Sequence, residues 1–279
     1  MLQPIESGLS KGGLHYAIYG TGKPLLAIHG LGACVYTWRE FVRTADVFPG
    51  YQIILVDLKG CGESLKPHDN NYSILTQRDL VYEFLEERGL RDLTLVGNSY
   101  GGGVSLLLTL KLCANERGRL AKLILIDSAA YNKLLPLHVK LLRVPLIGWL
   151  GVHLLSPRNQ VKKVLDACYY DHAKISEESI TEYSRPIAAP GGRYALLKIG
   201  QQAIPKNFDE LTQQYPKLKV PTLIIWGVND KIIPPVIGEM LHAAVGGSRL
   251  ELINNCGHMP QEEKPEETIK LMREFLGIQ

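Results

Sequence analysis

The stretch LVGNSYGG, residues 95–102, decides how the rest of the chain is interpreted. An apolar, strand-like run stops at Gly97, Ser99 follows two positions later, and a leucine-rich segment over 100–115 predicts a helix. Residues 97–101 therefore form G-x-S-x-G between a strand and a helix, the context that a nucleophile elbow requires. A turn serine with no chemistry is the alternative. The strand-turn-helix context favours a serine nucleophile on a strained turn.

The chain outward from this stretch alternates short apolar runs with amphipathic ones. Strands are predicted over 14–20, 24–30, 51–57, 92–98, 121–128, 219–227 and 248–254. Helices are predicted over 37–48, 74–89, 100–115, 235–245 and 264–276. Uniformly apolar strands separated by helices indicate a mostly parallel sheet that is covered on both faces. We therefore predict an α/β fold with a doubly wound central sheet.

The alternation pauses between residues 129 and 214, where only helical segments and polar loops are predicted. An all-helical insertion in an α/β sheet has the character of a lid. We predict a core formed by 1–130 and 206–279, with a helical lid over 131–205. A leucine-rich stretch at 134–155 could line a pocket for an acyl chain or touch a lipid interface, although core packing is the commoner role of such a stretch.

Composition excludes several classes of function. The net charge of +3 over 279 residues does not indicate a nucleic-acid binder, and no apolar stretch is long enough for a membrane-spanning helix. The first residues lack the apolar run of a signal peptide, and the five cysteines show no C-x-x-C spacing, so we expect free thiols and a cytoplasmic protein. No H-E-x-x-H occurs, so neither a metal nor another cofactor is expected. Monomer and dimer remain equally open.

Polar residues gather where the predicted strands end, which is where ligands bind in an open parallel sheet. A serine nucleophile needs a base, and the base needs a carboxylate that orients it. The order serine, acid, histidine is met by Ser99, Asp230 and His258. Asp127, which follows the preceding strand, is the rival acid. His29 and Asp57 also end strands, and we expect both to support loops.

An oxyanion needs two backbone donors held in place beforehand. The Tyr100 N–H, at the start of the predicted helix, is one. The second is expected in the loop HGLGAC, where we choose the Leu31 N–H over those of Gly30 and Gly32. Three cysteines, Cys34, Cys61 and Cys256, occupy loops near this site. Simple packing is favoured for them over reactivity toward thiol reagents.

These motifs together resemble the α/β-hydrolase family, and within it the lid-bearing serine hydrolases. The resemblance rests on HGLG (29–32), DLKGCGES (57–64), GNSYGG (97–102), WGVND (226–230) and CGHMPQEEKPEE (256–267). It implies a central sheet of about eight strands, and it does not extend to the lid. Lys59 stands where the family usually has arginine, which a loop-fixing role tolerates.

The resemblance implies a carboxylic ester hydrolase that acts on small to medium apolar esters through an acyl-enzyme. Carbon–carbon bond hydrolases share the Asn98-Ser99 elbow, but they usually carry tryptophan where Met259 stands here. A serine at the elbow argues against the branches that use aspartate there. A ligand receptor or signalling protein with slow turnover is the alternative from another class. Arg185 could reach a substrate carboxylate but is left out of the predicted site.

Overall fold

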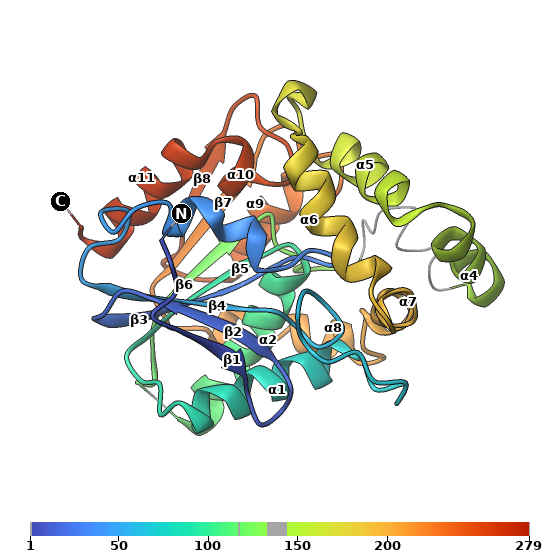
Figure 1. The fold of residues 1–279 in the computed structure, drawn as a ribbon. Helices are drawn as coiled ribbons and strands as arrows, with labels where there is room; N and C mark the ends of the chain where they lie inside the picture. Colours follow the sequence, from blue (N-terminus) through green and yellow to red (C-terminus); the bar gives the residue numbers. More distant parts are fainter. Residues whose placement is uncertain (1, 117, 133–143, 279) are drawn as a thin grey trace.

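The computed structural model describes residues 2–116, 118–132 and 144–278. Its centre is an eight-stranded sheet in the order β1-β2-β4-β3-β5-β6-β7-β8 (Figure 1). The strands are β1 (Glu6–Leu9), β2 (His15–Tyr19), β3 (Lys23–Ile28), β4 (Tyr51–Val56), β5 (Leu93–Asn98), β6 (Leu120–Ile126), β7 (Thr222–Gly227) and β8 (Arg249–Ile253). The predicted α/β class and strand number are confirmed.

Most neighbouring strands run parallel. Only the β1–β2 and β2–β4 pairs are antiparallel, whereas every pairing from β4 through β3 to β8 is parallel. β3 pairs with both β4 and β5, so the strand order reverses at its carboxyl end. Such a reversal opens a crevice for ligands at that edge. Sequence analysis missed β1, because its ESGL segment is short, mostly exposed and not apolar.

Helices cover both faces of the sheet. The helices α1 (Ile74–Glu87), α2 (Tyr100–Asn115) and α9 (Val236–Ala244) pack on one face, and η1 (Val35–Val42) and α11 (Pro265–Leu276) pack on the other. Alternate residues of a strand point to opposite faces. In β3, Leu26 and Ile28 therefore join the first cluster, whereas Leu25 and Ala27 join the second. This two-sided burial explains why the strands are apolar throughout.

The helix predicted over 37–48 is wrong in type and length. Residues Val35–Val42 form a 3₁₀ helix, and no helix covers 43–48. A 3₁₀ helix places every third side chain on one face. Val35, Trp38 and Phe41 follow that spacing: Trp38 and Phe41 belong to the core cluster of this face of the sheet, and Val35 packs against it. Core packing has selected the tighter helix.

Helices also fill the chain between β6 and β7, where no described residue forms a strand. The longer ones are α4 (Pro145–Leu154), α5 (Pro157–Cys168), α6 (Glu177–Ala188) and α7 (Gly192–Gln202), called here the inserted helices. Short helical segments lie in the same part of the chain: η2 (His172–Lys174), α8 (Phe208–Thr212) and η3 (Tyr215–Lys217). The short helix α10 (Pro260–Glu263) follows β8, near the C-terminus.

The inserted helices have a small core of their own. Apolar residues of α5 and α6, including Leu165 and Tyr183, pack with Cys34 and Met259, which belong to loops at the carboxyl edge of the sheet. In Figure 1 these helices stand to one side of the sheet, at the right. Residues 134–143 of the leucine-rich stretch lie outside the described residues. In the described part of the chain, no helix has both the length and the apolar character needed to cross a bilayer.

The central strands should carry much of the stability. Replacing Leu125, which is fully buried in β6, with alanine removes apolar contacts and leaves a cavity, so Leu125→Ala should lower the free energy of unfolding by about 2–5 kcal/mol. Leu252 in β8 is 44% exposed, and Leu252→Ala should change this free energy by less than about 1 kcal/mol. Urea denaturation measures both values. Equal losses would contradict the assigned burial.

Candidate active site

The turn between β5 and α2 holds Ser99 in an unusual backbone conformation. Its φ is +54° and its ψ is −119°, a region that costs free energy for any residue with a β-carbon. Backbone hydrogen bonds hold it there: the Ser99 N–H donates to the Ile126 carbonyl at 3.0 Å, and its carbonyl accepts from the Ala129 N–H at 2.9 Å. The loop after β6 thus fixes the elbow.

The glycines of the elbow are required by close packing. A β-carbon at Gly97 would lie 2.5 Å from the carbonyl oxygen of Gly101. A β-carbon at Gly101 would lie 2.2 Å from the carbonyl oxygen of Ile28, so α2 starts in direct contact with the end of β3. Any side chain at these positions would push the helix away from the sheet and displace Ser99.

The structure brings Ser99, His258 and Asp230 together although 159 and 28 residues separate the bonded pairs. The Ser99 Oγ lies 2.8 Å from His258 Nε2, and His258 Nδ1 lies 2.6 Å from Asp230 Oδ2. In the neutral ring, Nδ1–H donates to the carboxylate and Nε2 accepts from the serine hydroxyl. Proton transfer from Ser99 to His258 needs no rearrangement of these groups.

Two backbone amides orient the Asp230 carboxylate. Its Oδ1 accepts from the N–H groups of Ile232 at 2.7 Å and Ile233 at 3.0 Å, which leaves Oδ2 for the histidine. The rival acid, Asp127, has no hydrogen bond with His258 in the described structure. Its Oδ1 accepts instead from the Gly227 N–H at 3.0 Å. The geometry therefore places Asp230, and not Asp127, against the ring.

The loop that carries His258 is anchored to α10 and to the inserted helices. The His258 N–H donates to the carbonyl of Cys168, at the end of α5, at 2.6 Å. The Gly257 N–H donates to Glu263 Oε2 at 2.7 Å, and Glu263 Oε1 accepts from the Asp171 N–H at 2.7 Å. Glu263 thereby joins the histidine loop to the chain that follows α5.

The neighbouring Glu262 has a second set of partners. Its carboxylate accepts from Tyr169 at 3.1 Å, Tyr183 at 2.5 Å, Thr37 at 2.7 Å and the Arg39 guanidinium at 2.5 Å. Sequence analysis quoted the PQEE segment but assigned it no role. The only signal was a pair of acidic residues four and five positions after His258, in a region predicted to be close to the site.

The two predicted oxyanion donors lie beside Ser99. Leu31, Tyr100 and Ser99 line one cavity, and a β-carbon at Gly30 would be 3.3 Å from the Ser99 β-carbon. The N–H groups of Leu31 and Tyr100 donate to no described residue, so both can donate a hydrogen bond to an oxygen atom of a ligand. His29 supports this loop, because its Nδ1 bonds the Gly30 carbonyl at 2.7 Å.

His29 is also tied to the next loop and stays neutral. Its Nε2 accepts from the Leu58 N–H at 3.0 Å, which requires the proton on Nδ1. Complete burial lowers the pKa of His29, despite the nearby negative charge of Asp57. Sequence analysis expected a supporting role for this residue, and these contacts describe one.

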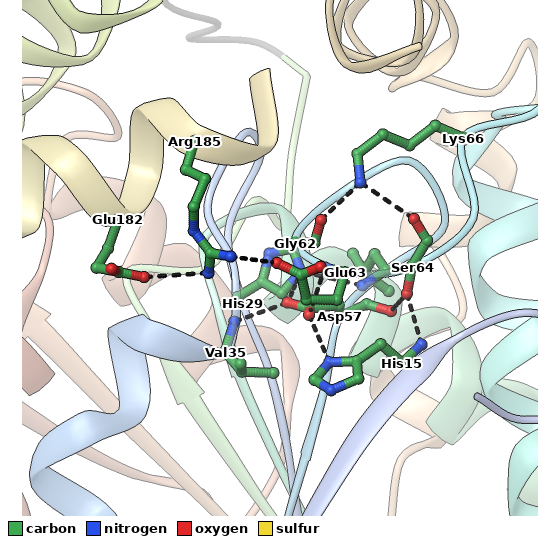
Figure 2. A network of polar contacts seen from close by, with 11 residues as sticks. His15, His29, Val35, Asp57, Gly62, Glu63, Ser64, Lys66, Glu182 and Arg185 are labelled. Carbon is green, nitrogen blue, oxygen red and sulfur yellow. Dashed lines mark hydrogen bonds and ion pairs between the residues drawn. The ribbon is translucent and has the colours of Figure 1, made fainter. Parts of the chain in front are cut away.

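Asp57 ties together the loops around the site (Figure 2). Its carboxylate accepts from the Val35 N–H at 2.8 Å and the Glu63 N–H at 3.0 Å, and it bonds His15 Nδ1 at 2.8 Å. Burial alone would raise the pKa of Asp57, but the His15 bond and the neighbouring donors hold it below its usual value. Asp57 thus fixes its loop as a carboxylate.

Lys59 and Arg185 also act on loops. The Lys59 Nζ donates to Asp69 at 2.6 Å and to the Asn71 carbonyl at 3.0 Å, which fixes the segment that precedes α1. Arg185 pairs with Glu63 at 2.8 Å, as Figure 2 shows, and is not among the described residues that line the cavity. Arg185 therefore serves as a surface contact between α6 and the core.

A cavity of about 440 Å³ extends from Ser99 toward the inserted helices. Its walls are mainly apolar and include Leu31, Ile147, Val152, Val161, Leu165 and Met259. Among the described lining residues, Lys163 and the His258 ring are the only groups that can be cations, and no Asp or Glu lines the cavity. Its volume suits a small to medium organic ligand.

Three buried side chains at the site could approach a metal ion. Asp127, Asp230 and His258 each offer one ligand atom within 4.8 Å of the others. Both ring nitrogens of His258 already bond Asp230 and Ser99, so a metal would have to displace one of these partners. The arrangement favours proton transfer over metal binding.

Comparison with known proteins gives the family. Residues 23–265 match the family described as "alpha/beta hydrolase fold", and the chain belongs to that family. It is 28% identical over 260 residues to "Lipase 3" of a Moraxella species, a match that covers 91% of this chain and 78% of the lipase. The resemblance seen in the sequence is confirmed.

A second relative is a different kind of hydrolase. The chain is 28% identical over 276 residues to "2-hydroxy-6-oxononadienedioate/2-hydroxy-6-oxononatrienedioate hydrolase" of Paraburkholderia phymatum, covering 95% of this chain and 91% of the relative. The solved meta-cleavage product hydrolase of Pseudomonas fluorescens has the same fold, with a TM-score of 0.78, 22% identity and 98% of each chain covered. The relatives therefore include both a lipase and a hydrolase named for dienedioate and trienedioate substrates.

The cysteines near the site should react slowly in the folded protein. Burial raises the pKa of the Cys61 thiol to about 12 and raises those of Cys34, Cys168 and Cys256, so these thiols are protonated as well as enclosed. Only Cys113 is partly exposed. At neutral pH we expect iodoacetamide to modify Cys113 alone, and Cys113→Ser to abolish labelling. Rapid modification of Cys61, found by peptide mass spectrometry, would contradict this.

Proposed function

We propose that this member of the α/β-hydrolase-fold family is a serine hydrolase that cleaves carboxylic esters of small to medium, apolar substrates. One observation carries the proposal: the 2.8 Å and 2.6 Å contacts that join Ser99, His258 and Asp230 open onto an apolar cavity of about 440 Å³. In this proposal the three residues are nucleophile, general base and orienting acid.

The reaction proceeds in two halves. His258 takes the Ser99 proton as Oγ attacks the ester carbonyl, and the amides of Leu31 and Tyr100 receive the oxyanion. The C–O bond to the alcohol breaks, His258 returns the proton to the departing alkoxide, and an acyl-enzyme remains. Water then attacks the acyl carbon, His258 takes the proton of the water, and the acid leaves as Oγ regains a proton.

The cavity supports an apolar ester over a carbon–carbon bond substrate. The dienedioate and trienedioate named for the Paraburkholderia phymatum hydrolase carry two carboxylates. Buried carboxylates need cationic partners. Of the residues described around the cavity, only Lys163 and His258 can be cations, and His258 is engaged in the triad. Activity on such a dienedioate exceeding that on any ester would favour the carbon–carbon alternative.

The proposed domain division follows from the same cavity. We assign 1–130 and 206–279 to the core and 131–205 to a lid, because α4 and α5 supply much of the cavity wall.

We place the protein in the cytoplasm on the ground that all five cysteines are free. The receptor alternative is separated by turnover, since a receptor would hydrolyse every ester very slowly.

Removal of the nucleophile tests the proposal most directly. Ser99→Ala should lower kcat for p-nitrophenyl esters by about 10⁴-fold or more, because no other group can form the acyl-enzyme. Ser7→Ala, an exposed serine on β1, is the matched control and should retain wild-type rates. Both variants are assayed from acetate to palmitate. Robust hydrolysis by Ser99→Ala would refute the serine mechanism.

The wall formed by α4 should set the acyl length. A β-carbon at Gly151 meets no atom within 4 Å, and this residue lines the cavity, so a leucine there fits and fills space. Gly151→Leu should lower kcat/KM for the longer esters by about tenfold and spare the acetate. Gly246→Leu, equally open but remote from the cavity, is the control. An equal loss at every chain length would show that the acyl group lies elsewhere.

A further inference from the structure

Asp127 lies beside the proposed triad, yet no step of the reaction uses it. It directly follows β6, its side chain is completely buried, and its φ is +43°, in the left-handed region. A carboxylate oxygen of Asp127 is within 4.8 Å of both a carboxylate oxygen of Asp230 and a ring nitrogen of His258. A strained, buried acid at this distance from a second acid needs an explanation.

The two acids differ in the donors they receive. Asp230 accepts from three groups: the amides of Ile232 and Ile233 and the Nδ1–H of His258. Asp127 accepts only from the Gly227 amide, at Oδ1, and its buried Oδ2 has no hydrogen-bond partner among the described residues. Donated hydrogen bonds stabilise the charged form of a carboxyl group. The hydrogen-bond donors of the site therefore converge on Asp230 and not on Asp127.

Each of two carboxylates this close in a buried site disfavours a charge on the other. Burial and the charge of Asp230 raise the pKa of Asp127 well above its usual value, and the charge of Glu263 acts in the same direction. The facing thiols, Cys168 and Cys256, are neutral because burial raises their pKa values. The remaining titratable neighbour, His258, bonds Asp230. The proton shared by the two acids therefore belongs on Asp127.

We propose that Asp127 is a neutral positioning residue whose Oδ2–H donates a hydrogen bond to the Asp230 carboxylate. This inference rests on the proposed function, because it assigns Asp230 as the acid of the triad. The bond gives the unpartnered Oδ2 of Asp127 a role and adds a fourth donor to Asp230. It also keeps a second negative charge away from His258, which must retain a free lone pair on Nε2 to accept the Ser99 proton.

The side chain can be removed without adding backbone strain. Asp127→Gly suits a positive φ and deletes the donor. The Asp230 carboxylate then loses a bond that positions it, which lowers kcat, and interacts more strongly with imidazolium, which shifts the pH profile. We expect kcat to fall about tenfold and the acidic limb of the kcat/KM profile to move to higher pH. Asp127→Asn keeps a donor for Asp230 and an acceptor for Gly227, and it should rescue both defects. Urea denaturation shows whether each variant is folded.

The same change at the other acid gives the matched comparison. Asp230→Asn should lower kcat by about 10⁴-fold, because an amide no longer holds the histidine tautomer that accepts the Ser99 proton. If Asp127→Asn lost as much activity as Asp230→Asn, Asp127 would be a working carboxylate and the proposal would be wrong. Failure of Asp127→Asn to rescue the shifted pH limb of Asp127→Gly would overturn it equally.

Infrared spectroscopy detects the proton without any substrate. At neutral pH the folded wild-type protein should show the carbonyl band of a neutral carboxylic acid, and Asp127→Asn should lack it. Absence of the band in the wild type, or its persistence in Asp127→Asn, overturns the proposal. Because this measurement needs no turnover, it separates failure of the inference from failure of the proposed esterase activity.

Discussion

The backbone of Ser99 is the constraint on which the site depends, because its positive φ turns the chain from β5 into α2 within one residue. Such a conformation costs about 1–3 kcal/mol and persists only where the surroundings over-determine it. Here the Ser99 amide and carbonyl are both bonded to the chain around the end of β6. The absence of side chains at Gly97 and Gly101 lets α2 begin against β3. The turn then holds the Ser99 Oγ 2.8 Å from the Nε2 of His258.

Buried carboxyl groups lie near this turn, and they differ in the number of hydrogen bonds that they accept. Asp57 receives two backbone amides and a histidine, and it remains ionised despite burial. Asp230 receives two amides and the ring of His258. Asp127 receives one amide. Hydrogen bonds to a carboxylate oppose the cost of desolvation, so three chemically identical side chains acquire different roles at one sheet edge.

The walls of the cavity and the loop of His258 share their supports. Glu263 bonds both the Gly257 amide and the chain after α5, while Glu262 receives the hydroxyl of Tyr183, a residue that lines the cavity. The His258 amide is itself bonded to the end of α5. A shift of α5 relative to the sheet would therefore move His258. The shape of the cavity and the position of the His258 ring are thus mechanically coupled.

Local pattern in the sequence was sufficient for most of the sheet and for the elbow. The central strands β3 to β7 were predictable because burial on both faces makes them largely apolar, whereas β1 is exposed and leaves no such signal. The elbow was predictable because its glycines and serine are adjacent in the chain. The 3₁₀ helix η1 was mistaken for a longer helix, since packing of Trp38 and Phe41 on the sheet selected its pitch.

Only the tertiary structure decided which acid faces His258 and which residues hold its loop. Asp127 and Asp230 both follow parallel strands, and the sequence favoured Asp230 while leaving Asp127 as the rival. Their difference lies in donors that the fold brings from distant positions, such as Gly227, which is 100 residues from Asp127. Glu262 likewise meets Thr37 across 225 residues. A sequence pattern records residue type and local spacing, but charge and hydrogen bonding depend on contacts that form only when the chain has folded.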